Sequence, residues 1–100
     1  MKIPLFLSSG DPIADRRCQF AQELAGRGET AQARDILEQA LERAPAFAAA
    51  WFALGEACER LGEHDAAEAA FRQALSCDPQ DRQGASLRLA RLSADGIAAM

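Results

Sequence analysis

Valine and tyrosine are absent from this 100-residue sequence, and the β-branched residues isoleucine and threonine together occur only five times. Because β-strands are enriched in β-branched and aromatic residues, a chain so poor in them cannot readily build a sheet. Alanine instead supplies 23 positions, and leucine, glutamate, glutamine and arginine are also frequent. These residues lose little conformational entropy in a helix. The composition therefore predicts one small domain with an all-α fold.

The sequence also lacks an excess of basic residues, since its net charge is −4. A nucleic-acid-binding surface needs basic residues to neutralise phosphates, and docking on an anionic membrane has the same requirement. We therefore expect neither nucleic acid nor a membrane as a partner.

No apolar run reaches the roughly 18 to 20 residues that cross a bilayer. Near the start, Pro4 interrupts an apolar stretch that is shorter than the roughly 7 to 15 residues of a signal-peptide core. We interpret residues 1–10 as an extended N-terminal segment of the mature protein, and we expect a cytoplasmic location.

Residues that could carry catalysis or bind a metal are few. Three cysteines, Cys18, Cys58 and Cys77, are an odd number and too few for a disulfide framework. Neither they nor His64, the single histidine, have the close spacing that brings zinc ligands together. No nucleophile elbow or phosphate-binding loop occurs. The sequence therefore predicts a protein without a metal, a cofactor or a catalytic site.

An internal repeat organises the chain. Gly28, Gly62 and Gly96 are evenly spaced, and the same interval separates Pro45 from Pro79. Aligning residues 14–47 with residues 48–81, which are offset by that interval, also pairs glutamate, glutamine, leucine and alanine positions. A period of roughly 20 to 50 residues, as here, is typical of repeat architectures.

Each repeat is predicted to contain two helices. Apolar residues at helical spacing are followed by a glycine, which can end a helix by adopting positive φ. The pairs Asp11-Pro12 and Asp78-Pro79 each offer a capping carboxylate before a proline at the first helical position. A further turn is expected at Gly96. The predicted helices span residues 12–26, 29–43, 47–61, 63–76 and 80–94.

Small residues are expected where the two helices of a repeat approach each other. Ala21 and Gly55 occupy one such position, and Ala33 and Ala67 occupy another. A bulky side chain at these positions would hold the helices apart, whereas Phe71 supplies volume that fills the core.

The second repeat carries signature residues at defined spacings: Trp51-x2-Leu54-Gly55-x2-Cys58, then Gly62, Ala67-x3-Phe71, Ala74-Leu75 and Pro79. This pattern resembles the tetratricopeptide repeat, with Cys58 where that family usually has tyrosine. The first repeat is more divergent and has Arg17 in place of the tryptophan.

The resemblance covers residues 14–94 and implies a helix–turn–helix solenoid of about five helices. Repeats 14–47 and 48–81 would be followed by a helix over 80–94 that caps the array or opens a third repeat. The domain would span residues 11–96, and residues 97–100 would be the tail of a truncated chain.

The resemblance also implies a function, because tetratricopeptide domains are protein–protein interaction modules or scaffolds. They bind a peptide or a partner helix in a concave groove, which the first helix of each repeat lines. Phe52 is the bulky apolar residue on the corresponding stripe here, and it either anchors a partner side chain or covers a neighbouring helix. The implied groove residues are Asp15, Cys18, Gln22, Ala25, Phe52, Glu56, Glu59, Arg60, Gln83, Ser86 and Ala90.

The charge of the expected groove favours a neutral or basic partner over an acidic one. Domains of this family that bind acidic tails use lysine and asparagine, whereas the matching places here are Cys18, Gln22 and Ala53. Glu56 and Glu59 lie nearby and are expected to be uncompensated, so they would repel an acidic peptide.

Apolar residues on the last helix suggest a homodimer. Leu87, Leu89 and Leu92 are predicted to form an apolar surface that must be covered, although Leu89 and Leu92 also fit the inward face of a repeat helix. The cover would be a second copy of the chain, further residues of a longer parent, or the apolar start of the chain, residues 3–7.

An alternative function comes from residues 83–92. This segment loosely resembles one that, in some bacterial proteins, joins tetratricopeptide repeats to an S-adenosylmethionine-dependent methyltransferase domain. In that case the chain would be the non-catalytic recognition module at the front of a bacterial enzyme.

Overall fold

The computed structural model describes the backbone of residues 8–99 and the side chains of residues 8–93. In this range the chain forms five α-helices and no strand, which confirms the prediction of an all-α fold. The helices are α1 (Pro12–Gly26), α2 (Thr30–Arg43), α3 (Ala48–Arg60), α4 (His64–Cys77) and α5 (Ala85–Ala99).

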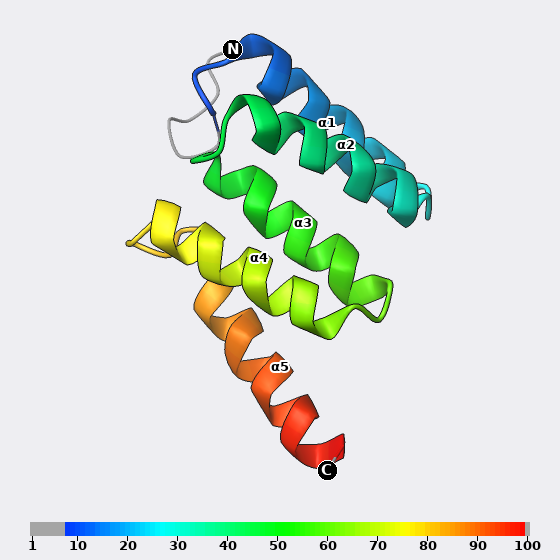
Figure 1. The fold of residues 1–100 in the computed structure, drawn as a ribbon, viewed down its shortest axis with the longest axis vertical. Coiled ribbons are helices and arrows are strands. Elements are labelled where there is room, and N and C mark those ends of the chain that lie inside the picture. The colour runs from blue at the N-terminus through cyan, green and yellow to red at the C-terminus, as the bar shows by residue number, and fades with distance from the viewer. Residues whose placement is uncertain (1–7, 100) are drawn as a thin grey trace.

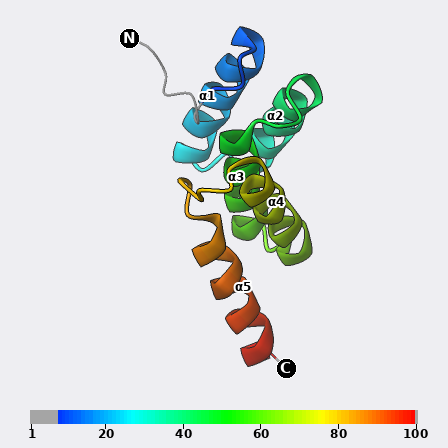
Figure 2. The same cartoon turned by 90° about the vertical axis from the view of Figure 1, so that its left-hand side faces the viewer.

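The first four helices form two hairpins that stack on each other. α1 and α2 make the first hairpin and α3 and α4 the second, while α3 packs against both helices of the first (Figure 1). α5 packs against α4 and projects away from the end of the stack opposite α1. Figure 2 shows α2 and α4 on one side of the molecule, and α1 and α5 on the other. Stacking in one direction gives an elongated body of 45 × 30 × 22 Å.

The two hairpins turn in the same way at equivalent positions of the repeat. Gly28 and Gly62 have φ values of 86° and 78°. The residue after each glycine donates a backbone hydrogen bond to the carbonyl five residues earlier. Glu29 N–H donates to Leu24 O and Glu63 N–H donates to Cys58 O, both at 2.9 Å. This pattern satisfies carbonyls that the end of a helix would otherwise leave unpaired. The repeat seen in the sequence is therefore a repeat of backbone geometry.

A close contact between α3 and α4 explains the glycine inside α3. A Cβ atom built on Gly55 would lie 2.6 Å from the ring of Phe71, closer than real Cβ contacts allow. Phe71 itself is fully buried, as are the alanines Ala67 and Ala74 beside it in α4. The expectation that a small residue at position 55 lets the two helices approach is confirmed.

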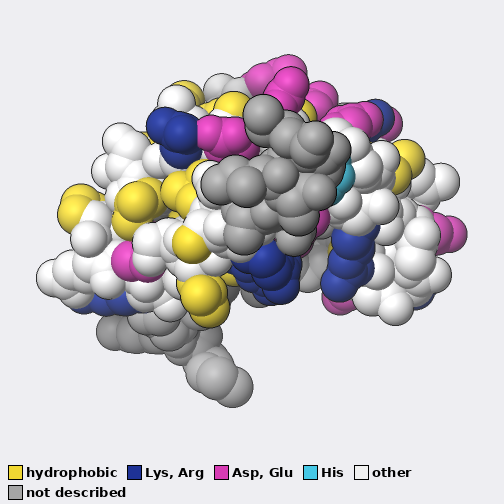
Figure 3. Space-filling view, turned by 90° about the horizontal axis from the view of Figure 1, so that it is seen from below, with side chains coloured by type: hydrophobic (Ala, Val, Ile, Leu, Met, Phe, Trp, Pro, Cys, Tyr) yellow, Lys and Arg dark blue, Asp and Glu magenta, His cyan; other side chains and the backbone are white. Residues whose placement is uncertain are grey.

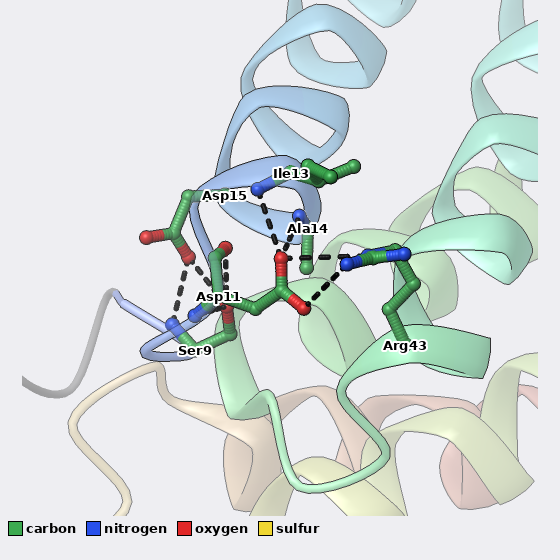
Figure 4. A network of polar contacts seen from close by, with 6 residues as sticks. All are labelled: Ser9, Asp11, Ile13, Ala14, Asp15 and Arg43. Carbon is green, nitrogen blue, oxygen red and sulfur yellow. Dashed lines mark hydrogen bonds and ion pairs between the residues drawn. The ribbon is translucent and has the colours of Figure 1, made fainter.

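The start of α1 is held by a network around Asp11, shown in Figure 4. The Asp11 carboxylate accepts hydrogen bonds from the N–H groups of Ile13, at 2.9 Å, and Ala14, at 3.2 Å. Its other oxygen lies 3.1 Å from the Arg43 guanidinium at the end of α2. The hydrogen bond from Ala14 and the partnership with Arg43 hold the pKa of Asp11 below its ordinary value. Asp11 therefore both caps α1 and ties α1 to α2.

This network predicts an acid-sensitive fold. The pKa of Asp11 is lower in the folded chain than the ordinary 3.8, so its contribution to stability is complete above that value. The contribution is lost as the pH falls through the folded pKa. Asparagine caps helices as well as aspartate but carries no charge. We expect thermal unfolding midpoints, followed by circular dichroism from neutral pH to below pH 3.8, to fall less for Asp11→Asn than for the unmodified chain.

Asp35→Asn, at an exposed carboxylate outside the network, is the control and should keep the full acid dependence. Parallel curves for all three proteins would contradict the prediction.

The prediction for the last helix was wrong at both ends. α5 begins at Ala85 rather than at residue 80, because Asp78 does not cap a helix. Its buried carboxylate instead accepts a hydrogen bond from Arg82 N–H at 2.7 Å, which closes a turn over residues 78–82. Asp81 then adopts a φ of 54°, and its carboxylate accepts a hydrogen bond from Ala85 N–H at 2.6 Å. The chain therefore makes two turns after α4 before it can become helical again.

The turn expected at Gly96 does not form either, because the backbone remains helical to Ala99. Glycine permits the left-handed conformation of a helix end but does not impose it. Residues 97–99 consequently belong to α5 rather than to a separate tail. Most of the predicted N-terminal segment, residues 1–7, lies outside the described residues, as does Met100.

Candidate functional site

A hollow of about 210 Å³ lies between the first hairpin and α3. Short alanine side chains line half of it, which leaves space where three helices meet. Leu37 of α2 is almost completely buried beside this hollow, while the exposed Gln22 and Arg60 contribute polar groups to its lining. The lining residues are Ala21, Gln22, Ala25, Gly26, Ala33, Leu37, Ala53, Glu56, Ala57 and Arg60.

Four of the predicted groove residues meet at this hollow: Gln22, Ala25, Glu56 and Arg60. The first two lie one turn apart on α1, and the other two lie one turn apart on α3. The Arg60 guanidinium donates a hydrogen bond of 3.4 Å to Ala25 O, so the last turn of α3 is joined to α1. The hollow therefore combines an apolar interior with an amide, a carboxylate and a guanidinium.

Most of the lining residues were not predicted as groove residues. Ala21 and Ala33 were interpreted only as packing positions. They belong to both groups, because an alanine that lets two helices approach also leaves a hollow where a third helix joins them. Two alanines of α3, Ala53 and Ala57, could have indicated this hollow in the sequence. They lie one turn apart and face the alanines of the first hairpin.

Cys18 and Asp15 do not take part in an open groove. Cys18 is 3% exposed and packs in the core, because it follows the buried Ala14 by one helical turn. Burial, assisted by the charge of Asp15, raises the pKa of the Cys18 thiol to about 11. Asp15 accepts hydrogen bonds from Ser9 N–H at 2.8 Å and from the Ser8 hydroxyl at 2.9 Å. Burial alone would raise the pKa of Asp15, but these bonds outweigh it and the pKa is lowered.

Phe52 covers a neighbouring helix, so the second of its two interpretations is the one that the structure supports. It is partly buried, and its ring centroid lies 5.4 Å from that of Phe71 in an edge-to-face arrangement. The guanidinium of Arg88 lies 5.6 Å from the Phe52 centroid, on the other helix that flanks it. Phe52 therefore joins α3 to α4 and α5.

Glu56 and Glu59 are compensated, contrary to the expectation from the sequence. The Arg88 guanidinium on α5 lies 2.9 Å from Glu56 and 3.4 Å from Glu59, and Arg91 lies 3.1 Å from Glu59. The Glu59 side chain is only 18% exposed, so its charge is partly shielded from water. These contacts join residues 29 to 32 positions apart, and they neutralise the negative charge that was expected to repel an acidic partner.

The predicted stripe does not continue onto α5 as a lining of the hollow. Gln83 precedes α5 and lies in a turn, where its amide nitrogen is buried without a hydrogen-bond partner among the described residues. The Ser86 hydroxyl donates to the Asp81 carboxylate, and Ala90 is exposed. The late start of α5 displaces these residues from the positions that an uninterrupted third repeat would give them.

The three leucines proposed for self-association do not form one exposed surface. Leu92 is 8% exposed and Leu89 packs against the core, whereas Leu87 is 75% exposed. Leu89 and Leu92 lie three residues apart on the inward face, and Leu87 points away from it. The three leucines therefore do not share one exposed face, and the inward placement of Leu89 and Leu92 is confirmed.

Charges on the described surface are mixed in sign. Figure 3 shows basic and acidic side chains on the same face, some of them side by side, rather than one field of either sign. Within residues 8–93, no cluster of three or more histidine, cysteine or carboxylate side chains could hold a metal ion. None of the described helices is both long enough and apolar enough to cross a bilayer.

Comparison with known families gives a match to the tetratricopeptide repeat over residues 18–82. Among curated proteins, the chain is similar to cellulose synthase operon protein C of Xanthomonas axonopodis pv. citri (strain 306), with 40% identity over 70 residues. That match covers 70% of this chain but 4% of the relative's length. Neither match is to a methyltransferase.

Proposed function

Because this chain belongs to the tetratricopeptide repeat family, we propose that it is a non-catalytic interaction module that binds a partner protein at the hollow between α1, α2 and α3. Repeats of this family generally mediate protein–protein interaction. The observation that supports this location is the meeting of Gln22, Ala25, Glu56 and Arg60 around an apolar interior. An apolar hollow with a few polar groups beside it is typical of a binding site.

The partner that we propose is a peptide or helix that inserts one apolar side chain into the hollow. Burial of a leucine or phenylalanine side chain would contribute about 1.5–3 kcal/mol. Gln22 can donate to and accept from the partner backbone, and Arg60 can donate to a carbonyl, since it makes only one long hydrogen bond to Ala25. Alanine walls make the fit depend on the size of the inserted side chain.

The partner segment is proposed to be close to neutral. Arg88 and Arg91 offset Glu56 and Glu59, so the reason for preferring a basic segment is gone. Selectivity would come from shape and from hydrogen bonds at the hollow rather than from a field of one sign.

Two wider functions gain no support. The loose likeness of residues 83–92 to a segment before a methyltransferase is not matched by the comparisons. The similarity to cellulose synthase operon protein C concerns a small part of that protein. We therefore base the proposal on the repeats alone.

A substitution that fills the hollow should abolish binding there. Ala53 is partly buried in its lining, so Ala53→Trp would place an indole in the space without removing a core side chain. The control is Gln39→Trp, on the exposed face of α2 away from the hollow. Peptides are first selected for binding the unmodified chain from a phage-displayed library of random short peptides. Calorimetry should then show affinity reduced at least about tenfold by Ala53→Trp, a loss of about 1.4 kcal/mol, and unchanged by Gln39→Trp. If both variants bind equally well, the peptides occupy another surface.

A further inference from the structure

α1 exposes an apolar face on the side of the molecule away from α3. Ile13 is 48% exposed and Phe20 46% exposed, and they lie two helical turns apart. Together with Arg16, Arg17, Gln19 and Glu23 they line a depression of about 460 Å³. This surface shares no lining residue with the hollow between the hairpins.

The internal repeat shows what this face would contact. One repeat after Ile13 and Phe20 come Phe47 and Leu54, which are only 2% and 8% exposed. Both belong to the core, at the start of α3 and within it, and α3 packs against α2 as well as α4. The face of α1 is thus in the position of an interface between successive hairpins, but no described residue covers it. By analogy with the interface between α2 and α3, the face of α1 would be covered by a helix that resembles α2. Such a helix has alanines and leucines along one stripe.

The described residues before α1, residues 8–11, do not form such a helix. Ser8 and Ser9 correspond in the repeat to the last helical residues of α2, yet neither is helical. The Asp15 carboxylate holds both serines, and the Ser9 N–H and hydroxyl lie 2.8 and 2.7 Å from it. A second copy does not offer the matching face either, since its α2 is already packed on α3 and its α4 on α5. We assign the helix to a different protein because of the charges on this face.

The arginines on this face indicate the charge of the occupant. Arg16 and Arg17 stand where the second repeat has Ala50 and Trp51. Neither arginine takes part in the ion pairs formed among the described residues. Arg16 is exposed and Arg17 is partly buried. Guanidinium groups beside apolar side chains favour carboxylates on an approaching partner.

We propose that the outer face of α1 binds an amphipathic helix of another protein. The apolar stripe of that helix covers Ile13 and Phe20, and its acidic residues pair with Arg16 and Arg17. The polar residues of this face keep it compatible with water when the partner is absent, as suits an interface that forms and separates. This surface is independent of the proposed groove, so either can be correct without the other.

The test uses a helix of known complementarity to the equivalent interface. The probe is a fluorescent peptide with the sequence of residues 30–44, held helical by a hydrocarbon staple on its polar face. Its three carboxylates and two arginines give it an acidic side-chain balance. Fluorescence anisotropy should show saturable binding to the full chain, and the affinity should fall with added salt.

Three variants locate the binding. Phe20→Asp should weaken it at least about tenfold, because it places a carboxylate in the apolar contact. Leu87→Asp, a matched change at an exposed leucine on α5, should leave it unchanged. Ala53→Trp should also leave it unchanged, which separates this surface from the groove. Circular dichroism checks that each variant keeps its helical content.

Three results would overturn the proposal. The first is absence of binding to the unmodified chain. The second is equal affinity for Phe20→Asp and the unmodified chain, since the peptide would then have displaced the native α2 or bound elsewhere. The third is a dimer in sedimentation that Phe20→Asp converts to monomer, because a second copy would then be the occupant.

Discussion

Replacing Gly55 with alanine is expected to lower the free energy of unfolding by about 1–3 kcal/mol, the range for overpacked cores. The added Cβ would lie 2.6–2.8 Å from three atoms of the Phe71 ring. That ring cannot retreat freely, because it is fully buried and packs against the Phe52 ring in an edge-to-face arrangement. For a domain of this size each kcal/mol shifts the unfolding midpoint by about 4–8 °C, so thermal unfolding followed by circular dichroism would resolve the effect.

Gly26→Ala is the matched control, since it makes the same change in another helix. A Cβ on Gly26 would have no neighbouring atom within 4 Å. Alanine also restricts the unfolded chain, so this variant should be neutral or more stable by about 0.4–1 kcal/mol. Destabilisation of both variants by the same amount would show that the contact with Phe71 is not what requires glycine at position 55.

Phe71→Ala is expected to cost about 3–5 kcal/mol, the largest effect of any single truncation that we predict. Phe71 is 0% exposed, and its removal leaves a cavity between α3 and α4 beneath Phe52. A small domain is stable by only about 5–15 kcal/mol, so the variant should lose a large part of its stability. Urea denaturation measures the free energy directly if the variant still folds, and loss of the helical signal supports the prediction if it does not.

Phe20→Ala provides the comparison, because it removes the same side chain from an exposed position. Phe20 is 46% exposed on the outer face of α1, so its truncation should change stability by about 0.5 kcal/mol or less. A loss comparable to that of Phe71→Ala would mean that the outer face of α1 is covered in the isolated chain.

Local and periodic features of the fold could be predicted from the sequence. The capping role of Asp11, the turns at Gly28 and Gly62, and the close approach at Gly55 each depend on a few neighbouring residues or on the repeat. α5 could not be placed in this way. Asp78-Pro79 satisfies the rule for starting a helix, but the carboxylate of Asp78 closed a turn with Arg82 instead. Two local structures compete for the same side chain, and the sequence pattern does not rank them.

The candidate site was predicted in part, for a reason that applies to helical repeats in general. A stripe of residues gives the direction that side chains face, but not how deep each one lies once other helices have packed beside it. Cys18 and Phe52 lie on the predicted stripe and are nevertheless covered, Cys18 by the core and Phe52 by Arg88. The pairing of Glu59 with Arg88 and Arg91 depends on how α5 meets α3, and the late start of α5 changes which residues lie at that meeting.

The matched turns at Gly28 and Gly62 have a consequence for how such a chain can change over time. Because both hairpins end with the same backbone geometry, one hairpin can be copied or lost as a whole repeat while the others keep their contacts. The arginines of α1 and the displaced start of α5 are two places where this chain departs from its own repeat.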